Sequence, residues 1–214
     1  MQKGENILIS TRTRNLSKRH FQNNFIVYFI LVIFFVIGII IGAILINRLS
    51  AEEKLKIANY FSWIFKYIGE KNYRSIDIFK LSLFSNVKIV LVIWIVGLIG
   101  LGILIIPLIL CCKGVAIGFT VGFLVKEFGI KGFMFALSGL LPHYLIIIPG
   151  FLAIGAVGLS YSMYRVKSKR NRIYSKDIAD YSILILLFFI VVIVGSFVEG
   201  FITPYFLNLI RFSL

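Results

Sequence analysis

The chain contains long runs of residues without a single charged side chain. Four such runs cover residues 25–46, 89–112, 132–164 and 181–198. A helix of about 20 apolar residues crosses the hydrocarbon core of a bilayer, and each run reaches or approaches that length. With 59% hydrophobic and only 15% charged residues, the chain does not resemble a soluble globular domain. The sequence therefore predicts an all-α polytopic membrane protein.

A fifth apolar run is much shorter than the other four. It covers only the 12 residues 114–125, and a helix of that length is about 18 Å long. Snorkelling of Lys126 would extend it to residue 128, which still leaves it short. The segment is therefore either a short span or a re-entrant segment packed inside protein. The predicted fold has about five transmembrane helices, of which the third is short or re-entrant.

These runs divide the chain into spans and connections. The first run is preceded by polar residues and lacks a cleavage site, so we expect a retained anchor rather than a signal peptide. Pro142 and Pro149 each remove a backbone donor and predict kinks in the fourth span. The predicted spans are residues 25–46, 89–112, 114–128, 132–161 and 181–206.

The formal net charge of +14 is concentrated outside the predicted spans. Basic clusters lie in residues 1–24 and 162–180, and such clusters beside spans mark the cytoplasmic side and contact anionic lipid. We therefore expect a cytoplasmic amino terminus, a cytoplasmic Lys113 and an extracytoplasmic carboxyl terminus. Few aromatic residues interleave the basic ones as single-stranded nucleic acid would require, so nucleic acid is not expected as a partner.

The segment 47–88 is predicted to be an extracytoplasmic loop that contains an amphipathic helix over residues 50–69. Ser50 and Glu53 have the spacing of a capping box, which starts a helix. One face of this helix is apolar and is expected to lie on lipid or on a partner. It consists of Ile57, Phe61, Ile64, Phe65 and Ile68.

Glycine recurs every four residues at Gly114, Gly118 and Gly122. This spacing places all three on one face of a helix, where the missing side chains let another helix approach closely. The repeat predicts tight helix packing but does not say whether the second helix belongs to the same chain. No strand precedes the glycines and no nucleotide-binding pattern is present.

His143 is the one histidine inside a predicted span. An ionisable group at membrane depth suggests a functional site, but no Asp or Glu occurs between Glu127 and Asp177 to assist a proton relay. A structural hydrogen bond across helices is therefore the favoured interpretation. With only His20 as a second histidine, we expect no metal site, and we find no catalytic constellation and no cofactor motif.

The stretch CKGVAIGFTVGFLVKEFGIKGFMFALSGLLPHYLIIIPGFLAIGAVGLSYS, residues 112–162, resembles the stage II sporulation protein M family of bacterial integral membrane proteins. The resemblance extends to the first span and the last apolar segment. In the wider family the Pro-His pair is followed by a glycine and then a glutamate, where this chain has Tyr144 and Ile147. This departure removes a carboxylate that a proton relay would need.

The resemblance implies a function that composition does not. Sporulation members of the family act in engulfment, as non-enzymatic scaffolds for two peptidoglycan-degrading partners, the stage II sporulation proteins D and P. The leading hypothesis is therefore a scaffold in the septal or engulfing mother-cell membrane, with lipid and a second copy of itself as further candidate partners. The alternative is a permease or channel-like transport subunit, which the glycine-rich and proline-broken helices suggest.

Overall fold

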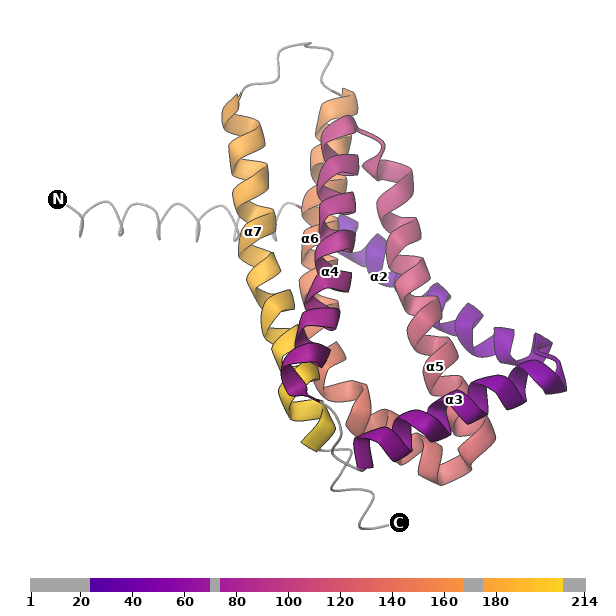
Figure 1. Ribbon diagram of the computed structural model, residues 1–214. Coiled ribbons are helices and arrows are strands. Elements are labelled where there is room, and N and C mark those ends of the chain that lie inside the picture. The colour runs from indigo at the N-terminus through magenta and orange to yellow at the C-terminus, as the bar shows by residue number, and fades with distance from the viewer. Residues whose placement is uncertain (1–23, 70–73, 168–174, 206–214) are drawn as a thin grey trace.

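Five long helices make up most of the residues that the computed structural model describes, which are 24–69, 74–167 and 175–205 (Figure 1). Each is long and apolar enough to cross a membrane, which confirms a multi-pass helical membrane protein. They are α2 (Phe25–Leu45), α4 (Ser75–Ile99), α5 (Gly102–Gly139), α6 (Leu141–Lys167) and α7 (Ser175–Phe197). The 3₁₀ turn η1 (Ile46–Arg48) extends α2, and the π-helix η2 (Val198–Ile202) extends α7.

Helix α6 lies at the centre of the bundle and packs against α2, α4, α5 and α7. Its Phe151 and Ile154 are almost fully buried, together with Leu31 of α2, Ile93 of α4 and Ile106 of α5. Lipid tails are as apolar as these side chains, so burial gains little from the hydrophobic effect here. Close packing and its dispersion contacts hold the helices together instead.

The closest helix–helix approach is between α2 and α5. A β-carbon added at Gly114 would overlap the carbonyl oxygen of Phe35, and one added at Gly118 would overlap that of Ile39. On the other side, Gly38 and Gly42 of α2 lie equally close to the backbone of α5. The helix that faces the glycine repeat is therefore α2 of the same chain, which carries a matching GxxxG pair.

The structure corrects the predicted second span. Residues 89–112 do not form one helix, because α4 ends at Ile99 and the chain turns at Gly100, whose φ of 88° is left-handed. Glycine adopts this conformation without steric cost and commonly ends helices. The span begins earlier than predicted, at Ser75, so residues 75–88 belong to α4 and not to a loop.

The predicted short third span is also wrong. Helix α5 starts at Gly102, runs through Lys113 without interruption and breaks only at Gly129, whose φ is 59°. A short leg, residues 130–139, then leads to α6, and a β-carbon at Gly132 would overlap the carbonyl oxygen of Leu124. The two legs are therefore folded sharply against each other.

The fourth span begins later than predicted, at Leu141. Pro142 consequently lies in the first turn of α6, where a helix loses no hydrogen bond to proline, and it does not kink a span. Pro149 lies inside α6 as expected.

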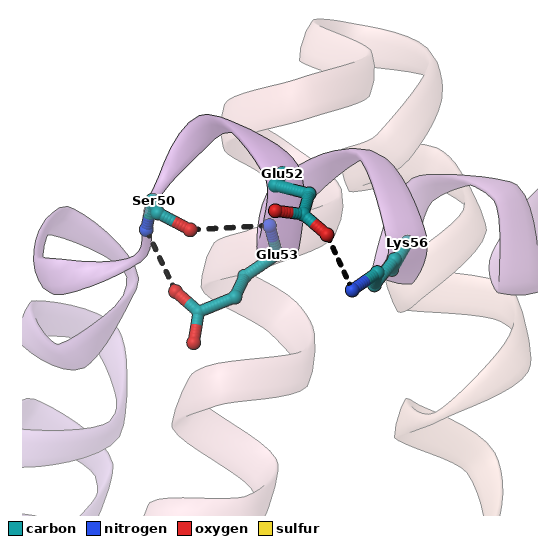
Figure 2. A network of polar contacts seen from close by, with 4 residues as sticks. All are labelled: Ser50, Glu52, Glu53 and Lys56. Atoms are coloured by element: carbon teal, nitrogen blue, oxygen red, sulfur yellow. Dashed lines mark hydrogen bonds and ion pairs between the residues drawn. The ribbon is translucent and has the colours of Figure 1, made fainter.

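Helix α3 (Ala51–Gly69) lies crosswise to α4, α6 and α7 at one end of the bundle, which we call the α3 end (Figure 1). The Ser50 amide donates to Glu53 Oε2 at 2.8 Å, and the Glu53 amide donates to Ser50 Oγ at 3.3 Å, so the predicted capping box is present (Figure 2). The Ser50 amide lowers the pKa of the Glu53 carboxyl. The cap is therefore intact near neutral pH and is lost as the pH falls through this lowered pKa.

We predict that Gly118→Leu destabilises the bundle, because the side chain would force α2 away from α5. Overpacking typically lowers the free energy of unfolding by about 1–3 kcal/mol. Thermal unfolding of the purified protein in detergent, followed by circular dichroism, measures the effect. The control is Ala116→Leu, which adds a leucine at an exposed position on the same helix. Equal melting temperatures for the two variants would contradict the packing argument.

Candidate functional site

Lys113 lies well inside the bundle, about 17 Å along α5 from Gly102 at 1.5 Å per residue. Its Nζ donates a 3.1 Å hydrogen bond to Asn86 Oδ1 of α4 and lies 3.9 Å from the ring centroid of Phe151 of α6. The sequence predicted a cytoplasmic Lys113, because a charge usually ends a span. Here a hydrogen bond and a cation–π contact accept the ammonium group, so the helix continues past it.

A chain of hydrogen bonds leads from Lys113 to a carboxylate. The side-chain amide of Asn86 donates to Ser82 Oγ at 3.4 Å and to Ser196 Oγ of α7 at 3.0 Å. The Ser82 hydroxyl in turn donates to Glu199 Oε2 at 2.5 Å. The polar chain Lys113–Asn86–Ser82–Glu199 thus connects a cation on α5 to an anion beyond α7 through two residues of α4.

Glu199 lies in the π-helix η2, which packs against α4. A π-turn inserts an extra residue into a helix and often marks a functional site. It also turns the following residues toward α4, where a β-carbon at Gly200 would lie 2.7 Å from the Cβ of Phe79. Close packing of η2 on α4 brings Glu199 to Ser82.

His143 lies near the same carboxylate. Its side chain is buried, its Nδ1 is 3.4 Å from Thr203 Oγ1, and its ring lies 4.2 Å from that of Tyr144. Thr203 follows Glu199 by about one helical turn, so its contact places His143 at the same end of η2 as the carboxylate. The prediction that His143 has no acidic companion is therefore wrong, because η2 brings Glu199 to it from a part of the chain distant in sequence.

The polar chain serves to hold the helices together and does not form an open pathway through the bundle. A lone charge at membrane depth is costly, but the polar chain joins one cation to one anion and satisfies both through hydrogen bonds. Three elements, α4, α5 and η2, can keep all these bonds only in one relative position. The polar chain therefore fixes the register of the last helix on the bundle.

The other residues singled out from the sequence lie apart from the polar chain. Gly114, Gly118 and Gly122 face α2, and Pro149 is exposed on α6. Of the apolar face of α3, Ile57 and Phe61 are half-buried, and the Phe61 ring stacks on Phe123 of α5 with 5.7 Å between centroids. The side chains of Ile64, Phe65 and Ile68 lie outside the described residues. Within the described part of the chain, no three His, Cys, Asp or Glu residues gather as metal ligands.

The sequence model of the family described as Stage II sporulation protein M matches residues 31–204. This range covers well over half of the 214 residues and extends from α2 to the end of η2, so it includes every member of the polar chain. The chain belongs to the stage II sporulation protein M family. It is thus a multi-pass membrane protein of a sporulation family. No curated protein and no solved structure matches it.

For this member of the stage II sporulation protein M family, we predict that Lys113 and Glu199 depend on each other. Lys113→Met or Glu199→Gln alone should lower the free energy of unfolding by roughly 2.5–3.5 kcal/mol, because each leaves an unmatched, half-buried charge within the bundle. The double variant should lose clearly less than the sum of the two. Denaturation of the four proteins in detergent gives the coupling energy.

The matched control is Glu127→Gln, which removes an exposed carboxylate from α5. Glu127→Gln should not couple to Lys113→Met. Additive effects of Lys113→Met and Glu199→Gln would show that the polar chain does not connect them.

Proposed function

We propose that the protein is a non-enzymatic membrane scaffold that recruits and localises peptidoglycan-degrading proteins during engulfment in endospore formation. Membership of the stage II sporulation protein M family is the observation that carries this proposal. The partners we propose are the stage II sporulation proteins D and P, and the hydrolysis of the cell wall is theirs. The membrane concerned is the septal and later the engulfing mother-cell membrane.

Two features of the structure support a scaffold. The first is a bundle held by specific contacts, the α2–α5 glycine interface and the polar chain, which suit a frame of fixed shape. The second is α3, which lies across the α3 end with Tyr60 and Trp63 exposed and their rings stacked. The Phe61 ring stacks on Phe123 of α5, so this part of the predicted apolar face lies against the bundle, and the exposed Tyr60 and Trp63 offer aromatic surface to lipid or a partner.

One observation favours the alternative of a transport subunit. Transporters often carry ionisable groups at membrane depth beside interrupted helices. The polar chain and the breaks at Gly129 and η2 have both properties. The two proposals differ in their partners, since a permease of this kind would associate with an ATPase.

We predict that cell-wall hydrolases copurify with the tagged full-length protein when it is purified in mild detergent from sporulating cells. A scaffold must hold its enzymes stably enough to localise them. Mass spectrometry of the complex identifies the partners, and an equally tagged unrelated multi-pass protein is the control. Recovery of an ATPase without hydrolases would replace the scaffold by the permease.

We propose in addition that the α3 end is extracytoplasmic, because the basic clusters of residues 1–24 and 162–180 favour the cytoplasm. In a variant without Cys111 and Cys112, Arg74→Cys should react with a membrane-impermeant thiol reagent in intact cells. The control, Lys167→Cys at the opposite end, should react only after lysis. Both side chains are exposed. The reverse pattern would invert the orientation.

A further inference from the structure

Lys88 is a charged residue on the outer surface of a membrane span. It lies about 20 Å along α4 from Ser75 and about 17 Å from Ile99, at 1.5 Å per residue. Its side chain is exposed, and the apolar side chains around it, Phe84 and Leu91, are 61% and 50% exposed. The ammonium group therefore lies near the middle of the span and on the side that faces away from the bundle.

This position is unfavourable for a lysine that faces only lipid. Charged residues at membrane depth almost always face the interior of a bundle or a partner, and a lysine at the centre of a span costs at least about 2.5–3.5 kcal/mol. Snorkelling gives little relief, because the lysine stem reaches roughly one helical turn, ~5.4 Å. Among the described residues, the ammonium group of Lys88 lies over the Phe84 ring, 4.2 Å from its centroid.

A groove lies between α4 and α7, and two of its lining residues, Val87 and Leu91, flank Lys88 along α4. It has a volume of about 260 Å³ and is lined by Val87, Leu91 and Trp94 of α4 and by Ile185, Leu186 and Phe189 of α7. The Trp94 indole donates a 3.1 Å hydrogen bond to Ser182 Oγ, which ties the two helices together along it. The groove is thus an apolar recess with a cation at its edge.

We propose that this surface binds a transmembrane helix of another protein, one that carries a carboxylate near its middle. Apolar side chains of that helix fill the groove, and its carboxylate pairs with Lys88. This proposal rests on the proposed scaffold function, because that function is what implies a partner protein. It locates the contact within the bilayer and gives the chemistry of the partner helix.

A second copy of the chain does not offer such a carboxylate. The sequence has nine acidic residues, and those in the described part lie near helix ends or are already bound. Asp77 is in the first turn of α4, Glu127 is close to the break in α5, and Glu199 accepts from Ser82. The others are Glu52 and Glu53 of α3 and Asp177 and Asp180 of α7, with Glu5 and Glu70 outside the described residues. The complementary charge therefore comes from a different chain.

The test places a photo-cross-linking amino acid at Leu91 in the full-length protein in sporulating cells. After irradiation, the adduct should contain a peptide from an apolar segment of another protein with Asp or Glu inside it. Lys88→Met should lower the adduct yield at least tenfold without lowering the melting temperature, because it removes only the charge. Lys80→Met, exposed on the same helix near its end, should leave the yield unchanged.

Pairing is then tested by exchanging the charges. Lys88→Asp should abolish the adduct, and changing the partner's acidic residue to lysine should restore it. An adduct that survives Lys88→Met, that lacks an acidic residue, that joins two copies of this chain or that contains only lipid would overturn the proposal.

The outcome is separable from that of the proposed function. Hydrolases that copurify with the protein but give no adduct at Leu91 would leave the scaffold standing and overturn this surface. An adduct with an acidic helix, obtained while purification recovers no wall hydrolase, would support this surface and overturn the scaffold.

Discussion

Inside a bilayer, apolar side chains gain almost nothing by leaving lipid for protein, and this constraint explains how the structure is held together. Stability must come from contacts that lipid does not match. Two extended contacts of this kind lie in the described part of the chain: the backbone of α2 against that of α5 at Gly38 and Gly118, and the polar chain from Lys113 to Glu199. The first depends on the absence of side chains and the second on their hydrogen bonds.

The two contacts act on different parts of the bundle. The glycine interface joins α2 to α5, while the polar chain joins α5 to α4 and to the end of α7. Helix α6 fills the space between them, and its Phe151 also covers the ammonium group of Lys113. A change in one contact is therefore felt in the other through α5, which takes part in both.

The general architecture was predictable from the sequence, but the ends of the helices were not. Charge-free runs indicate spans well, because most charges do lie outside a membrane. They mislead where a charge is buried, as at Lys113, or where a turn is made of apolar residues and glycine, as at Gly100. The glycine repeat and the capping box could be predicted from the sequence because each depends on residues close together in the chain. The link from His143 to Glu199 was not, because only the fold brings residues so distant in sequence together.

The polar chain also has a consequence for the order of assembly. Ribosomes make the chain from its amino terminus, so Ser82 and Asn86 are already present when Lys113 enters the membrane, whereas Glu199 follows 86 residues after Lys113. Before Glu199 is made, Lys113 can bind the side-chain amide of Asn86 but has no negatively charged partner. Completion of the last helix neutralises the interior of the bundle, and a chain cut short before η2 would retain an unmatched positive charge that membrane quality control can recognise.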